Sequence, residues 1–164
     1  MRLWHEALIP YLPKHQLLGQ HRECCALRGA GWGKTHSTVT YVFEHPYEDL
    51  FIYHKRVMEE MQHRGYKVDP KWLSPAYRGS SVPTIVYYDP NDGLPSSFVV
   101  RRTKETWYRS KNFLAYADKK AAKGEYVYPE HDHFYLDSCL ENLESKGHNL
   151  WFVQDNLLRK EGLL

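Results

Sequence analysis

The chain has 164 residues, a formal net charge of +2, 42% hydrophobic residues and 26% charged residues. This length and composition are typical of a single globular domain that can bury a core, so we expect residues 1–164 to form one domain. No run of 18 or more apolar residues and no basic-then-apolar leader occurs, which argues against a membrane protein and a signal peptide. Three cysteines, with Cys24 and Cys25 adjacent, favour reduced thiols in a cytoplasmic protein.

The first expected element is an amphipathic helix from about Pro13 to Leu27, ended by a glycine-rich stretch. One buried stripe at helical spacing is predicted to contain Leu17, Leu18, His21, Cys24, Cys25 and the stem of Arg28. The opposite side carries the charged pair Arg22–Glu23, flanked by the small residues Gly19 and Ala26 together with Gln16 and Gln20. Such a cleared patch lets a second backbone or a nucleic-acid strand approach, although a solvated helix face explains the same pattern.

Gly33-Lys34-Thr35 has the ending of a phosphate-binding P-loop. That motif requires a glycine where this chain has Arg28, and a buried strand where we expect a helix. A nucleotide-hydrolysing site is therefore not predicted.

A second helix is predicted to begin near Pro46 and to end at Gly65, with Glu48 and Asp49 in its first turn, where the helix dipole favours acids. His54 and His63 on this helix point to opposite faces because nine residues turn a helix by about 900°. His131 and His133 diverge in the same way, and no cysteine or carboxylate pair has zinc spacing. We therefore predict no metal site.

Two β-branched and aromatic runs, 84–88 and 98–100, flank a strong turn sequence at 89–93. They predict a small β-hairpin or an extended loop near residues 82–100. A last helix is expected from about Pro129 to Lys146, with Gly147 after it. The predicted fold is mainly α, a compact domain of three or four helices.

Basic residues gather in segment 101–123, which has eight basic and two acidic residues and hence a charge of +6, leaving −4 for the remainder of the chain. Four aromatic residues are interleaved with these charges, namely Trp107, Tyr108, Phe113 and Tyr116. Cations that hold phosphates beside rings that stack on bases are typical of a nucleic-acid surface. A lysine-rich helix face followed by a flexible stretch explains the pattern equally well.

Several separated pieces of the sequence form an ordered set: Arg2-Leu3, Leu17-Leu18, Arg22-Glu23, His36 with Val39-Thr40-Tyr41, Arg64-Gly65-Tyr66, Tyr77-Arg78-Gly79, Val82-Pro83 and Thr106-Trp107-Tyr108-Arg109. In this order they resemble the pyrimidine-dimer DNA glycosylases of the phage endonuclease V type, and more closely a bacterial branch of that family. The resemblance covers about residues 1–115, and no correspondence is seen beyond Lys123.

The resemblance implies a small, helical DNA repair enzyme that excises a damaged base and cleaves the resulting abasic site without metal or cofactor. The family's nucleophile is the terminal amine, here that of Met1, because Arg2 is too bulky for removal of the initiator. An α-amino group titrates near pH 7.7–8.0, against about 10.4 for lysine, so part of it is neutral at physiological pH. Glu23 matches the catalytic glutamate and Arg22 a residue that grips backbone phosphates.

The expected DNA-binding residues follow from the same resemblance and from the basic segment. They are Arg2, His15, Gln16, Arg28, Arg101, Arg102, Lys104, Trp107, Tyr108, Arg109 and Lys111. Gln16 stands where the family has a DNA-contacting histidine, with His15 adjacent, and Ala26 stands where it has an arginine, with Arg28 nearby. The expected partner is damaged double-stranded DNA. A non-catalytic nucleic-acid-binding module, with Arg22–Glu23 kept for structure, is the alternative.

Overall fold

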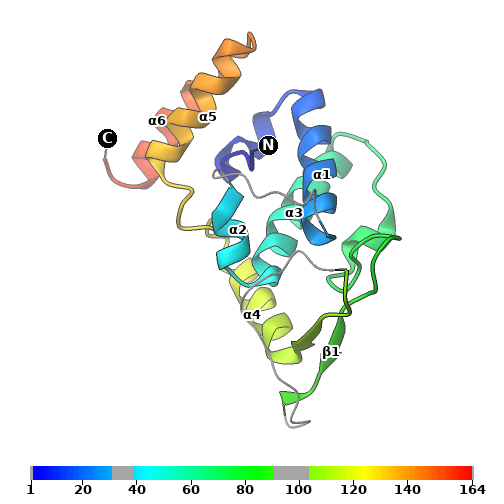
Figure 1. The fold of residues 1–164 in the computed structure, drawn as a ribbon. Helices are drawn as coiled ribbons and strands as arrows, with labels where there is room; N and C mark the ends of the chain where they lie inside the picture. Colours follow the sequence, from blue (N-terminus) through cyan, green and yellow to red (C-terminus); the bar gives the residue numbers. More distant parts are fainter. Residues whose placement is uncertain (1, 31–38, 91–103, 164) are drawn as a thin grey trace.

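The structure, a computed structural model, describes residues 2–30, 39–90 and 104–163, and Figure 1 shows that it is mainly helical. The α-helices are α1 (Lys14–Arg28), α2 (Thr40–Glu44), α3 (Tyr47–His63), α4 (Lys111–Ala122), α5 (His133–Ser145) and α6 (Phe152–Lys160). Two 3-10 helices, η1 (Glu6–Tyr11) and η3 (Pro70–Leu73), and two strands, β1 (Val86–Tyr88) and β2 (Tyr108–Ser110), complete the described elements. The mainly α fold is confirmed, with more helices than the three or four expected.

The two long central helices begin and end close to where the sequence predicts. Pro13 and Pro46 are the N-cap residues of α1 and α3, which suits a residue that has no backbone N–H to satisfy. At the end of α1, the Gly29 N–H donates to the carbonyls of Cys25 and Ala26. After α3, Gly65 adopts a φ of +83°, which is open to glycine at no steric cost. Local sequence signals therefore determine where both helices begin and end.

The C-terminal helices differ from the prediction. The helix α5 begins at His133, four residues after the expected Pro129, because the Asp132 side chain caps it by accepting from the Tyr135 N–H at 2.8 Å. The short helix α6 was not predicted. Figure 1 shows α5 and α6 side by side at one end of the molecule, and the two helices are in contact.

The strand pairing corrects the hairpin expectation. Strand β1 lies in the first predicted run, but it pairs in parallel with β2, with Tyr87 opposite Arg109. A parallel pair needs a long connection, so a tight turn at 89–93 cannot join these two strands. The second predicted run, 98–100, lies outside the described residues. Strand β2 therefore comes from the segment that the sequence assigned to a basic surface.

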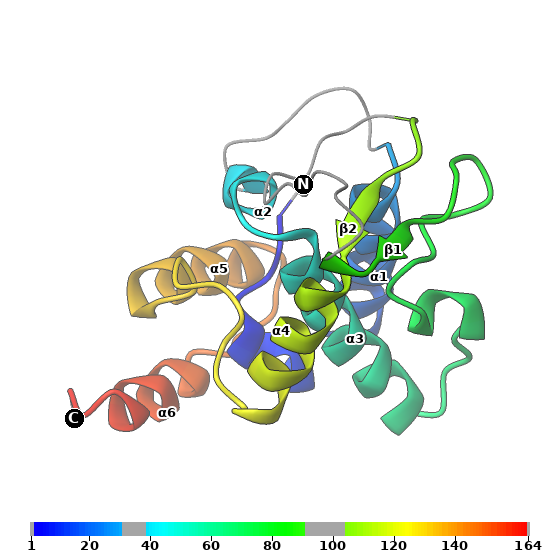
Figure 2. The same cartoon turned by 90° about the horizontal axis from the view of Figure 1, so that it is seen from below.

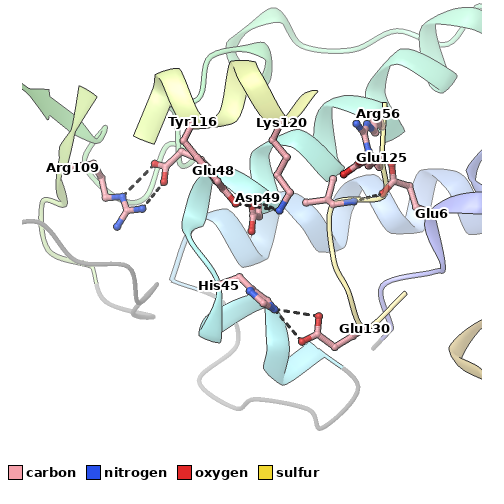
Figure 3. Close-up of polar contacts among 11 residues, drawn as sticks. Glu6, His45, Glu48, Asp49, Arg56, Arg109, Tyr116, Lys120, Glu125 and Glu130 are labelled. Atoms are coloured by element: carbon pink, nitrogen blue, oxygen red, sulfur yellow. Dashed lines mark hydrogen bonds and ion pairs between the residues drawn. The ribbon is translucent and has the colours of Figure 1, made fainter. Parts of the chain in front are cut away.

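Helices α1 and α3 pack together at the centre of the molecule, and Figure 2 shows α4 and the two strands beside them. One cluster of buried side chains runs from Leu3 through both helices to Leu157 in α6. Ion pairs fasten the outer elements to α3, as Figure 3 shows: Glu48 pairs with Arg109 of β2, and Asp49 with Lys120 of α4 at 3.2 Å. The N-terminal segment thus shares a core with the C-terminal helices.

Among the helices in the described ranges, none combines the length and the apolar character that a membrane crossing requires.

Candidate active site

A pocket of about 360 Å³ opens between the N-terminal segment, α1 and the end of α5. Its lining residues are Arg2, Trp4, Gln16, Gly19, Gln20, Glu23, Asn142 and Lys146. Glu23 is the single carboxylate in that set, and Arg2 and Lys146 carry positive charge. Three residues from the sequence prediction, Arg2, Gln16 and Glu23, therefore meet at one site.

Gln20 holds the parts of this pocket together. Its amide nitrogen donates to the Glu23 carboxylate at 3.0 Å and to the Arg2 carbonyl at 3.1 Å. Its amide oxygen accepts from the Trp4 N–H at 2.6 Å and from the Tyr53 hydroxyl at 3.0 Å. A buried amide whose donors and acceptor are all used has one orientation, so Gln20 aligns residues 2–4 with Glu23.

Glu23 is half-buried in this environment. Burial raises the pKa of its carboxyl above the ordinary value, while the backbone N–H of Arg2, the charge of Arg22 and the amide of Gln20 act in the opposite direction. A carboxyl with a raised pKa is a stronger base when ionised and is more often available as an acid. This is the property that general acid–base catalysis near neutral pH requires.

Arg22 and Glu23 are neighbours in sequence but line different cavities. The second cavity measures about 550 Å³ and contains Arg22, Lys104, Trp72 and Arg78 in its wall. Arg22 is exposed, and a Cβ added at Gly19 would lie 3.7 Å from its guanidinium, an ordinary van der Waals contact. The small residues at 19 and 26 therefore border the two cavities, one each, and space alone does not demand glycine at 19.

Arg28 does not lie on a DNA-facing surface, in contrast to the prediction. Its side chain is fully buried, and all five of its N–H donors are used. Nε donates to the Tyr47 hydroxyl, and Nη1 to His54 Nδ1 and the Trp72 carbonyl. Nη2 donates to the carbonyls of Ser74 and Tyr77 at 2.6 and 2.8 Å. Arg28 thus fastens the segment that follows η3 to the core.

Arg109 is also buried, in contrast to its predicted position on a DNA-binding surface. It is 3% exposed, forms an ion pair with the fully buried Glu48, and its guanidinium carbon lies 3.9 Å from the Phe113 ring centroid. Its charge is therefore neutralised inside the protein. Trp107 is half-buried beneath Arg78, whose guanidinium lies 3.3 Å from the centroid of its ring system.

The other predicted DNA-binding residues keep an exposed position or lie outside the described ranges. Lys104, Tyr108 and Lys111 are exposed, and Lys111 pairs with Asp89 at 3.5 Å. His15 is exposed in the first turn of α1. Met1, Arg101, Arg102 and the Gly33-Lys34-Thr35 stretch lie outside the described residues. The basic segment is therefore divided between interior and surface.

Within the described part of the chain, His21, Cys25 and His54 form a group whose metal-ligand atoms lie within 4.8 Å of one another. Its hydrogen bonds are already satisfied without an ion. Because Arg28 donates to His54 Nδ1, the His54 proton resides on Nε2 and is donated to His21 Nδ1 at 2.8 Å. His21 Nε2 then faces Cys25 Sγ at 3.8 Å.

Electrostatics further disfavour a cation at this group. Burial raises the pKa of the Cys25 thiol to about 11, which disfavours the thiolate that a metal ion would require. Burial and the Arg28 charge lower the pKa of both histidines, and the same Arg28 charge repels a cation. Sequence reasoning missed the cluster because His21 and His54 come from different helices.

Four pocket residues were also missed: Trp4, Gln20, Asn142 and Lys146. Gln20 was assigned to the exposed side of α1, yet it is 1% exposed. Its spacing from Leu17, Cys24 and Leu27 places it in the buried row of α1, and that spacing was the available signal. Asn142 and Lys146 gave no such signal because they lie far beyond the resemblance.

The fold and this pocket together define a mainly helical protein with one carboxylate held beside its N-terminal segment. Residues 1–74 match the family model of pyrimidine dimer DNA glycosylases, which confirms the family predicted from the sequence over this part of the chain. The match supports a DNA repair activity of that kind, with DNA as substrate. No curated protein and no solved structure matches the chain.

Proposed function

We propose that the chain excises pyrimidine dimers from double-stranded DNA and cleaves the strand at the abasic sugar, with its N-terminal amine as nucleophile and Glu23 as acid–base group. The supporting observation is that the Gln20 amide donates to both the Glu23 carboxylate, at 3.0 Å, and the Arg2 carbonyl, at 3.1 Å. Gln20 thus holds the Glu23 carboxylate beside the residue that follows Met1.

The chemistry follows from an amine beside a carboxylate. The amine forms a bond to C1′ of the deoxyribose, and the bond from C1′ to the base breaks, leaving its electron pair on the base, which takes up a proton. Opening of the sugar ring gives an imine between the amine and C1′. Loss of a proton from C2′ then expels the 3′ phosphate, and water hydrolyses the imine. The protonated imine itself attracts the electrons, so no metal is required.

Glu23 serves both halves of this sequence. In its protonated form the carboxyl donates to the sugar ring oxygen as the ring opens, and as carboxylate it accepts the C2′ proton. The ionised form also stabilises the positive charge of the imine across a half-buried pocket, where charges interact more strongly than in water. Arg22, exposed in the neighbouring cavity with Lys104, would hold backbone phosphates of the same strand.

Borohydride trapping tests the proposal. Native protein is incubated with an abasic duplex and reduced, and the adduct is mapped by mass spectrometry to the N-terminal residue. Glu23→Gln should bind the duplex normally and cleave it roughly 10²–10⁴-fold more slowly, the usual loss for an acid–base group. Glu59→Gln, which removes an exposed carboxylate on α3, serves as the control for charge.

Two results would contradict the proposal. The first is unimpaired strand cleavage by Glu23→Gln. The second is a native protein that binds the duplex but gives no borohydride adduct, which would indicate the non-catalytic nucleic-acid-binding module.

A further inference from the structure

The helix α5 lies outside residues 1–74, yet Tyr135, Ser138 and Cys139 in it contact the N-terminal segment. The Tyr135 hydroxyl donates to the Leu3 carbonyl. One turn further, Arg2 Nη1 donates to Ser138 Oγ at 3.2 Å and approaches Cys139 Sγ at 3.6 Å. As the N-terminal segment is followed back from residue 3 to residue 2, its partners move toward the C-terminal end of α5.

The next two positions on this side of α5 are Asn142 and Lys146, since residues three or four apart share a helix face. Both line the pocket that contains Glu23. The end of α5 thus forms one wall of the candidate active site, and α1 supplies another.

Both residues keep polar groups that the described part of the protein does not use. The Lys146 side chain is exposed and enters no ion pair among the described residues. Its Nζ stands 5.7 Å from the centroid of the Trp4 ring at the edge of the pocket. Asn142 Oδ1 is buried, with no hydrogen-bond partner. A pocket wall that has unpaired hydrogen-bonding groups beside a carboxylate is suited to a polar ligand.

The charge of the pocket indicates which ligand. Arg2 and Lys146 outnumber Glu23, so the site attracts an anion. A DNA strand whose sugar reaches Glu23 presents a phosphate on each side of that sugar. Of the two pocket cations, Arg2 directs its Nη1 at Ser138 and Cys139 of α5. Lys146 is the cation whose donors are not directed at α5.

We propose that Lys146 binds a backbone phosphate next to the sugar on which Glu23 acts, so that α5 supplies a substrate-binding residue of the active site. The inference rests on the proposed function for the identity of the sugar. It assigns to the C-terminal part of the chain a direct role at the pocket, with Asn142 beside Lys146 on the same wall.

The test measures binding to a duplex that contains a tetrahydrofuran abasic analogue, which has no aldehyde and cannot form an imine. Binding is followed by fluorescence anisotropy from 50 to 200 mM salt for native protein, Lys146→Ala and Lys146→Arg. The control, Lys160→Ala, also removes a lysine at a helix end whose Nζ lies over an aromatic ring, here Tyr126 at 4.3 Å.

Lys146→Ala should reduce the log–log salt slope by about 0.9, the value for one phosphate contact on duplex DNA, and weaken binding several-fold at 50 mM salt. Lys146→Arg should restore both, whereas Lys160→Ala should leave both unchanged. Cleavage of an abasic duplex at sub-saturating enzyme should fall with Lys146→Ala in the same proportion as binding.

The inference is overturned if Lys146→Ala and Lys160→Ala give the same slope, or if Lys146→Ala lowers the melting temperature and leaves the slope unchanged, which would indicate a helix-end role only. A borohydride adduct mapped to Lys146 would overturn it as well, by making this residue the nucleophile. Because the analogue cannot react, the binding result stands whether or not the native protein forms an imine, which separates this inference from the proposed function.

Discussion

Helix α1 carries two polar sites that contrast sharply. On one side, Glu23 and Gln20 border an open pocket that is also lined by Asn142, whose Oδ1 has no hydrogen-bond partner in the described residues, and by Lys146. On the other, Arg28 lies in a closed cluster in which all five guanidinium donors have acceptors. The closed cluster is complete without a ligand, so its chemistry serves folding. The open pocket is incomplete by the same criterion, which is why the proposed function is assigned to the Glu23 side.

The largest expected effect is on stability and separates the two arginines of α1. Arg28→Met should lower the free energy of unfolding by about 4 kcal/mol or more, because Tyr47, His54 and three part-buried carbonyls lose their donor. Arg22→Met, which changes an exposed side chain, should lower it by less than about 0.5 kcal/mol. Urea unfolding at pH 7.5 measures both.

DNA affinity should rank the two variants in the reverse order. Folded Arg28→Met, studied at low temperature, should bind abasic duplex with the native salt slope, whereas Arg22→Met should show a shallower slope. A shallower salt slope for Arg28→Met would indicate that the closed cluster contacts DNA. The two sides of α1 would then not differ in function.

An intermediate effect is expected from acid. His21 and His54 have lowered pKa values in the folded protein, so the unfolded chain binds protons first as the pH falls. Their stabilising contribution is present above about pH 6.5 and is lost as the pH falls toward the folded-state pKa values. For each histidine the loss is at most about 1.4 kcal/mol per pH unit.

The measurement is the free energy of unfolding in urea at pH 7.5, 6 and 5. His63→Gln, which replaces an exposed histidine on α3, should reproduce the native pH dependence. His54→Gln should be less stable at pH 7.5 and should lose less stability on acidification. An equal loss for native protein and His54→Gln would show that the cluster is not what titrates.

The smallest effect concerns the stability contribution of Glu23. Its pKa is raised in the folded protein, so the contribution is favourable below the unfolded-state value and is lost as the pH rises through the folded-state value. At pH 7.5 the ionised carboxylate therefore opposes folding. Glu23→Gln should unfold at the same or a higher urea concentration, with a gain of at most about 1 kcal/mol because the open pocket screens the charge.

Substitution of a second glutamate, Glu6, should change the stability in the opposite direction. Glu6 pairs with Arg56 and accepts from the Val127 N–H at 2.9 Å, so Glu6→Gln should destabilise the protein. Calorimetry of the two variants at pH 7.5 compares them directly. A loss of stability for Glu23→Gln as large as that for Glu6→Gln would make Glu23 a structural residue.

Much of the fold could be predicted because its signals are local. Proline at the N-caps and glycine after the last turn define α1 and α3 to within a residue or two. The strand pairing could not be predicted, because β1 and β2 are joined across about 20 residues and no local turn specifies the pairing. In the sequence, helix α4 was indicated only by a pattern of charges that is also typical of a nucleic-acid surface.

The candidate site divides in the same way. Glu23 and Arg2 could be predicted because the resemblance includes them, and the structure places both at one pocket. Arg28 and Arg109 were misassigned because a cation in a sequence gives no indication of whether its partner lies in solvent or inside the fold. Their partners, the Trp72, Ser74 and Tyr77 carbonyls and Glu48, lie 44 to 61 residues away.

The sequence by itself determined the helical class, the ends of the central helices and the family of residues 1–74, because periodicity, caps and short motifs are written in neighbouring residues. Only the tertiary structure decided which charges are neutralised and which remain available. It buried Arg28 and Arg109, turned Arg22 and Glu23 toward different cavities, and brought Lys146 to the pocket from the far end of the chain. The reason is physical: the burial and partners of a charged group depend on elements that meet only after folding.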